Sequence, residues 1–247
     1  MVDRSRGPVA VLGGGGHAKV IIATLRAAGF TPSVVLDDDP SSWGGTVLGL
    51  PIHGPMASLP DHHVSGAVIA IGSNSVRIQI DRDLRDVEWL TVVHPQAVVD
   101  PTVRLGRGTV VFAGAVIQPD STLGDHVIVN TAATIDHDCV IEDFTHLAPG
   151  VHLAGSVHVG RGAFLGIGSV VIPGRRIGSG AVIGAGLGQF GLWSRPERCA
   201  LVLGVYAVQC VISVLWMRHF RFGPMEWLWR TVTYWRAQPM RRSVPPM

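Results

Sequence analysis

The chain has 247 residues, of which 47% are apolar and 15% are charged, and its formal net charge is +2. This length and apolar fraction allow one large or two modest hydrophobic cores, and the low charge excludes a disordered chain or one that coats nucleic acid. Three cysteines are too few for a disulfide framework, which favours a reducing compartment. Residues 187–247 hold eight arginines, two glutamates and five of the seven tryptophans, so we expect a domain boundary near residue 187.

Residues 1–92 are expected to form a Rossmann-like α/β domain. A buried-strand run at 9–12 leads into four glycines and His17, and a helical pattern follows from Ala18 to Ala28. Two more strands are expected at 34–36 and 68–71. Glycines before a helix let the backbone approach a ligand closely, and the helix N-terminus favours an anion. The spacing differs from G-x-G-x-x-G, so a turn that only lets the helix pack on the strand remains the alternative.

Residues 93–186 carry a six-residue repeat. Every sixth residue from Leu105 to Ile183, fourteen in all, is leucine, isoleucine or valine. The residues four positions further on are small or β-branched over most of this stretch. This pattern is the hexapeptide repeat, in which three hexads make one triangular coil with the aliphatic side chains inside. The sequence therefore predicts a parallel β-helix.

The densest polar stretch of the repeat, 130–139, is the expected position of any chemistry. Acyl transfer from a thioester to an amine needs a base with a pKa near neutrality, and His137 is of the right type. Asp138 or Asp136 beside it could hold one imidazole tautomer. The alternative is a corner histidine without a role. No histidine, cysteine or carboxylate cluster has the spacing of metal ligands, so no metal is expected.

Residues 9–186 resemble the sialic-acid O-acetyltransferases and bacillosamine-pathway N-acetyltransferases, which are hexapeptide-repeat sugar acetyltransferases. The matching stretches are Val11-Leu12-Gly13-Gly14-Gly15-Gly16-His17, Leu36-Asp37-Asp38, Ala70-Ile71-Gly72-Ser73-Asn74, His94-Pro95, Asn130-Thr131, Asp136-His137-Asp138-Cys139 and His146-Leu147-Ala148-Pro149-Gly150. The resemblance implies a left-handed β-helix, acetyl-CoA as co-substrate, homotrimers with active sites between the prisms, and a catalytic part in the cytoplasm.

The resemblance also implies roles for single residues. His137 would be the general base, supported by Asp138, and Cys139 would be structural rather than a nucleophile. The residues that would bind the nucleotide-linked sugar are Gly15, Gly16, His17, Asp37, Asp38 and Gly72. Those that would contact acetyl-CoA are His146, Gly155, Ile167 and Gly184.

The resemblance stops near residue 186, where the usual C-terminal turn of these relatives is replaced. Residues 199–217 form a 19-residue uncharged stretch between arginines, long enough to cross a bilayer as an apolar helix. The region after it resembles the end of a bacterial family of multi-spanning inner-membrane proteins of unknown function. The segment could insert into the inner membrane, lie on its surface through residues 199–235, pack as a core helix, or be an accidental join of two reading frames.

Two functions of different classes follow from these patterns. The first is an acetyl-CoA-dependent acetyltransferase that acts on the amine or hydroxyl of a nucleotide-activated amino sugar or a sialic-acid-like sugar in surface glycan synthesis. The second is a catalytically impaired, membrane-tethered protein that binds a sugar nucleotide and arose by fusion or truncation. A serine- or maltose-type acyltransferase is disfavoured, because those relatives lack a Rossmann-like domain in front of the β-helix. No nucleic-acid partner is expected.

Overall fold

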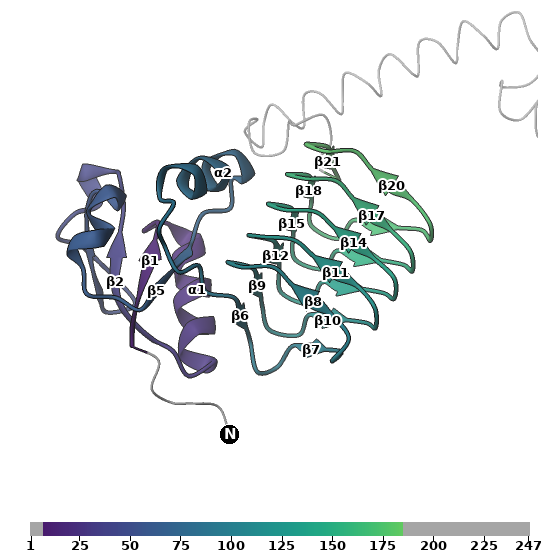
Figure 1. Ribbon diagram of the computed structural model, residues 1–247, viewed down its shortest axis with the longest axis horizontal. Helices are drawn as coiled ribbons and strands as arrows, with labels where there is room; N and C mark the ends of the chain where they lie inside the picture. The colour runs from purple at the N-terminus through teal and green to yellow at the C-terminus, as the bar shows by residue number, and fades with distance from the viewer. Residues whose placement is uncertain (1–6, 185–247) are drawn as a thin grey trace, which may run out of the picture. The chain divides into compact units, whose positions relative to one another are not determined.

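The computed structural model describes residues 7–184, which form one compact unit with two parts (Figure 1). The expected apolar helix at 199–217 lies outside the described residues. Within residues 7–184, the helices are too short or too polar to cross a membrane.

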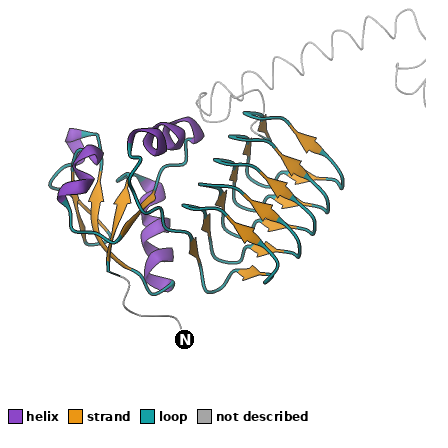
Figure 2. Ribbon diagram, viewed as in Figure 1, coloured by secondary structure: helices purple, strands orange, loops and turns teal. Residues whose placement is uncertain are grey.

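The first part is a small α/β domain around a five-stranded sheet (Figure 2). The sheet order is β3-β4-β2-β1-β5, and all neighbours are parallel except β3 and β4. A parallel sheet with helical crossovers is the Rossmann-like arrangement that the sequence predicts. The elements are β1 (Pro8–Leu12), α1 (Gly16–Ala27), β2 (Thr31–Leu36), the 3₁₀ turns η1 (Pro40–Ser42) and η2 (Met56–Asp61), β3 (Thr46–Val47), β4 (Leu50–His53), β5 (Gly66–Ile69) and α2 (Asn74–Asp83).

The second part is a parallel β-helix of two-residue strands in three sheets, here called A, B and C (Figures 1 and 2). Each strand pairs in parallel with the strand eighteen residues away, as in Val98 with Val116, so each coil takes three hexads. Sheet A contains β6 (Val92–Val93), β9 (Val110–Val111), β12 (Ile128–Val129), β15 (His146–Leu147), β18 (Phe164–Leu165) and β21 (Val182–Ile183). Sheet B contains β7 (Val98–Val99), β10 (Val116–Ile117), β13 (Thr134–Ile135), β16 (His152–Leu153) and β19 (Val170–Val171). Sheet C contains β8 (Arg104–Leu105), β11 (Thr122–Leu123), β14 (Val140–Ile141), β17 (His158–Val159) and β20 (Arg176–Ile177).

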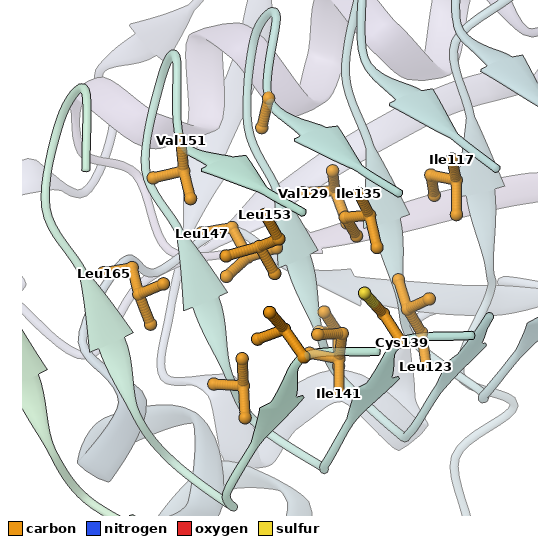
Figure 3. Close-up of a cluster of buried hydrophobic side chains, with 14 of the residues drawn as sticks. Ile117, Leu123, Val129, Ile135, Cys139, Ile141, Leu147, Val151, Leu153 and Leu165 are labelled. Atoms are coloured by element: carbon orange, nitrogen blue, oxygen red, sulfur yellow. The ribbon is translucent and has the colours of Figure 1, made fainter. Parts of the chain in front are cut away.

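The six-residue pattern is the wall of the β-helix core (Figure 3). The aliphatic residues from Val111 to Ile177 in this register are at most 8% exposed. The small residues four positions further on, Cys139 among them, are also buried. Fully burying an aliphatic side chain stabilises a protein by roughly 1.5–3 kcal/mol, so this column of side chains holds the coils together.

A second periodic feature lies at the turns, three positions after each aliphatic residue. There the backbone has positive φ, as at Gly108 (67°), Asp138 (58°) and Phe144 (57°). Glycine adopts this conformation without strain, whereas other residues pay for it sterically. Six of these turns in the middle coils nevertheless carry a non-glycine residue: Asp120, His126, Ala132, Asp138, Phe144 and Ser156.

The two parts meet at sheet A. Apolar residues of α1, including Ile21 and Leu25, share one buried cluster with Val110 and Ile128 of sheet A. Helix α2 meets the corner between sheets C and A, where the Asn74 side-chain amide donates to the Gly162 and Ala163 carbonyls. These contacts fix the α/β domain on one face of the triangular column.

Candidate active site

A cavity of about 500 Å³ opens at the carboxyl ends of β1, β2 and β5. Ligands of open parallel sheets bind at this edge, because the loops that leave the strands converge there. The cavity is lined by all six residues expected to bind the sugar nucleotide: Gly15, Gly16, His17, Asp37, Asp38 and Gly72.

Gly15 and Gly16 begin α1, and neither is required by the packing of the chain. A Cβ atom built at either position would meet no atom within 4 Å, and neither residue has a positive φ. By contrast, a Cβ at Gly13 would lie 2.7 Å from Ile71, and Gly13 has φ 110°. Gly13 thus serves the fold, whereas Gly15 and Gly16 leave room beside the free N–H groups of a helix start, where an anionic ligand would be favoured.

The two carboxylates at the end of β2 have different surroundings. Both oxygens of Asp37 accept backbone N–H groups, from Gly14 and from Asp39, so this side chain shapes the glycine loop. Asp38 accepts the Met56 N–H through Oδ1 at 2.8 Å, and its Oδ2 accepts no hydrogen bond within residues 7–184. Asp38 is therefore the carboxylate that can accept a donor from a ligand.

His17 and His146 lie side by side, with ring centroids 6.2 Å apart. His146 Nδ1 lies 3.2 Å from the Gly72 carbonyl and its Nε2 lies 3.2 Å from the Asn130 amide nitrogen, so its proton sits on Nδ1. Burial, followed by the nearby Arg77 charge, lowers the pKa of each histidine to about 4. His146 is only 7% exposed, and both of its ring nitrogens are engaged inside the chain.

The Nε2 atom of His17 is buried and has no hydrogen-bond partner within the described residues. Because buried polar atoms are normally paired, an orphan on a cavity-lining ring calls for a bound group. Five further cavity residues escaped the sequence reasoning, namely Met56 of η2 and Val76, Gln79, Ile80 and Asp83 of α2. The α2 pattern is too polar to signal a helix whose side face lines a site.

His137 lies elsewhere, at the turn between β13 of sheet B and β14 of sheet C. Its Nδ1 is 2.7 Å from Asp138 Oδ2, and this hydrogen bond, aided by the charge of Asp136, raises the pKa of His137 above its usual 6.5. The proton therefore sits on Nδ1, which leaves the Nε2 lone pair free on a side chain that is 58% exposed. This is the arrangement of a general base held in one tautomer by a carboxylate.

The corner that carries His137 is the one opposite sheet A, on which the α/β domain packs. Within one chain, the expected base therefore lies on the other side of the β-helix from the cavity, and His137 does not line that cavity. Gly155 lies one coil further along this corner, where a Cβ would come within 2.6 Å of His137 Cε1 and Nε2. The glycine makes the space that the imidazole ring occupies.

The remaining acetyl-CoA candidates are divided between two places. Ile167 and Gly184 lie on neighbouring coils at the corner between sheets A and B, and Ile167 is 78% exposed. His146 lies on sheet A, against the cavity. Cys139 is buried in the β-helix core, and burial raises the pKa of its thiol, which disfavours a nucleophile. Within residues 7–184, no group of three or more histidine, cysteine or acidic side chains could hold a metal.

The chain thus joins a Rossmann-like domain with a glycine-lined cavity to a hexapeptide β-helix that presents a histidine–aspartate pair. The sequence profile of the PglD N-terminal domain matches residues 8–84. The UDP-N-acetylbacillosamine N-acetyltransferase of Bacillus subtilis is 40% identical over 112 residues, which are 42% of this chain and 50% of that protein.

Solved structures extend the match over both parts. PerB from Caulobacter crescentus, in complex with CoA and GDP-perosamine, is 44% identical with a TM-score of 0.65, over 72% of this chain and 88% of that one. The acetyltransferase domain of PglB from Neisseria gonorrhoeae, in complex with acetyl coenzyme A, is 37% identical with a TM-score of 0.67, over 71% and 86%. The chain belongs to this family of sugar acetyltransferases.

The C-terminal region matches a different family. The profile of a protein family of unknown function, DUF418, covers residues 178–236. Two uncharacterised bacterial proteins, YxaH of Bacillus subtilis and YeiB of Escherichia coli, are 46% and 45% identical over 58 and 53 residues. The chain spans 14% of the length of each.

Proposed function

We propose that the protein transfers the acetyl group of acetyl-CoA to the amine of an amino sugar that is linked to a nucleoside diphosphate. The observation that carries this proposal is the His137–Asp138 pair, with a free Nε2, on a chain whose relatives include an enzyme bound to CoA and GDP-perosamine. Two relatives, the Bacillus subtilis protein and the perosamine enzyme of Caulobacter crescentus, are named as N-acetyltransferases. Their names favour an amine over a hydroxyl as the acceptor group.

In this reaction the amine nitrogen attacks the thioester carbonyl, a C–N bond forms and the C–S bond breaks. His137 Nε2 removes the proton that the amine loses, and the imidazolium passes this proton to the departing thiolate, which leaves as the thiol of CoA. The Asp138 carboxylate stabilises the imidazolium that results. No acyl-enzyme is required, in keeping with the buried position of Cys139.

The cavity would bind the nucleotide-linked part of the acceptor. The N–H groups at the start of α1 would hold its anionic group, and Asp38 Oδ2 and His17 Nε2 would take its hydrogen-bonding groups. The predicted acetyl-CoA contacts at Gly155, Ile167 and Gly184 would line the donor side. We take the β-helix as left-handed, the hand that the hexapeptide resemblance implies.

A second copy must then bring His137 to the cavity, because the two lie on opposite sides of the column in one chain. We therefore propose a homotrimer with sites between subunits, in which each site combines the cavity of one chain with His137 of its neighbour. Mixing a His137→Ala chain with a Gly16→Val chain tests this arrangement. Random trimers should restore about a quarter of the sites, whereas sites within one chain would restore none.

The activity is tested by release of free CoA thiol from acetyl-CoA with GDP-perosamine and with UDP-linked amino sugars. Turnover with one of them, lost in the His137→Ala variant, is the expected result. Binding of the nucleotide sugar without turnover would refute the proposal and favour the impaired binding protein. Thiol release that persists in the His137→Ala variant would remove His137 as the base.

A further inference from the structure

Arg77, in the middle of α2, is a buried cation without a counter-ion. Its side chain is 1% exposed, and no carboxylate pairs with it within residues 7–184. Its guanidinium donates to three backbone carbonyls: Ile71 at 3.2 Å, Gly72 at 3.0 Å and Phe144 at 2.8 Å. Its Nε is buried without a partner in the described residues. An unpaired buried charge is costly, so hydrophobic packing alone does not account for an arginine here.

The three carbonyls belong to two distant parts of the chain. Ile71 and Gly72 follow β5 and form one edge of the cavity. Phe144 lies at the corner between sheets C and A of the β-helix, and its φ of 57° is close to that of Gly108 (67°) and Gly162 (67°) at equivalent turns. We propose that Arg77 is a positioning residue, which sets the shape of the cavity by fixing its Ile71–Gly72 edge to the Phe144 coil of the β-helix. This inference rests on the proposed function, since it assigns the cavity to the sugar nucleotide.

The same edge also connects Arg77 to His146, which lies beside the cavity residue His17. The Gly72 carbonyl accepts from both Arg77 Nη1 and His146 Nδ1. The charged or titratable groups that act on these rings are Arg77 from α2, His17 from α1 and His146 from β15. A proton added to either ring would stand beside the fixed guanidinium charge. Burial is the larger cause of the low pKa of both rings, and the Arg77 charge lowers the pKa of each further.

Three variants separate the geometry from the charge. Arg77→Lys keeps the charge, but a single ammonium does not span carbonyls on both sides of the junction. Arg77→Met removes the charge and the hydrogen bonds. Arg82→Met is the matched control, because Arg82 is an exposed arginine on the same helix and does not line the cavity.

Two readouts are measured on the full chain. The first is the Kd for GDP and for UDP by calorimetry, which should rise about tenfold or more in both Arg77 variants and stay unchanged in Arg82→Met. The second is the titration of the histidine rings by NMR. The titration midpoints of His17 and His146 should rise in Arg77→Met and remain low in Arg77→Lys. If Arg77 had only a structural role, the midpoints would not depend on whether residue 77 is charged.

The proposal is overturned if folded Arg77 variants bind the nucleotides as the wild type does, or if the two midpoints are the same in Arg77→Met as in the wild type. If Arg77→Met does not fold, the nucleotide Kd of Arg77→Lys decides. If neither GDP nor UDP binds the wild type, the proposed nucleotide-sugar function fails, while the histidine titrations still test Arg77.

Discussion

Replacement of Gly155 by alanine should disable the base without unfolding the protein. The new Cβ would lie 2.6 Å from Cε1 and Nε2 of His137, whereas such atoms normally approach to about 3.5 Å. The imidazole must therefore move by about 1 Å. A displacement of this size at a reacting group costs on the order of 10²-fold in rate.

The stability of the fold should change little. Gly155 does not have a positive φ, so alanine fits the backbone, and His137 is 58% exposed, so its ring can swing into solvent. A surface change of this kind alters the free energy of unfolding by roughly 0.5 kcal/mol or less. Gly178→Ala is the matched control, because a Cβ there meets no atom within 4 Å and its φ is also not positive.

Steady-state kinetics with acetyl-CoA and the active sugar nucleotide, together with thermal unfolding, measure both effects. We expect kcat to fall about 10²-fold in Gly155→Ala, with wild-type rates in Gly178→Ala and similar melting temperatures in all three proteins. A wild-type kcat with a raised KM for acetyl-CoA would refute this reasoning. It would show that Gly155 acts only as the donor contact proposed above, and that the base keeps its position when a Cβ is added.

Three further predictions concern the base, the cavity and the core. His137→Ala should lower kcat by about 10²–10⁴-fold. Because Asp138 raises the pKa of His137, and the base acts when deprotonated, the acid limb of the wild-type kcat/KM profile should lie above pH 6.5 and move to lower pH in Asp138→Asn; an unmoved limb would contradict the pairing. Gly16→Ala should weaken nucleotide binding in calorimetry without lowering the melting temperature, since the position is open and alanine is the better helix former; unchanged affinity would count against a ligand at this helix start. Ile135→Ala, fully buried in the column, should cost about 2–5 kcal/mol in denaturant unfolding, and a cost under 1 kcal/mol would show a loosely packed interior.

The β-helix was predictable because its signal is local and periodic. The aliphatic residues recur every six positions, and those such as Ile135 and Leu147 are buried, so the spacing alone indicates which side chains form the core. The positive-φ turns were also visible in part as glycines at the same spacing. Non-glycine residues at 120, 126, 132, 138, 144 and 156 hid the rest of that pattern.

Much of the α/β domain could be predicted, but not α2 or the β3–β4 hairpin. Only two residues of α2 are buried, and one of them is Arg77, a residue type that is rarely buried. Strands β3 and β4 are two and four residues long, too short for a periodic pattern. The prediction that His146 contacts acetyl-CoA could not foresee its bond to the Gly72 carbonyl, because that contact arises only when the two parts pack together.

Because each coil takes eighteen residues, the length of the β-helix changes by one complete coil at a time. Neighbouring parallel strands are about 4.8 Å apart, so each added or deleted coil shifts everything beyond it by that one increment. A deletion of six or twelve residues would keep the aliphatic side chains inside but move every later residue to another face, and a deletion that is not a multiple of six would turn the interior side chains outward. The insertion of one complete eighteen-residue unit after Gly168 would therefore move the corner at Gly184 by one strand spacing and leave His137, Gly155 and the anchor of α2 at Gly162 in place.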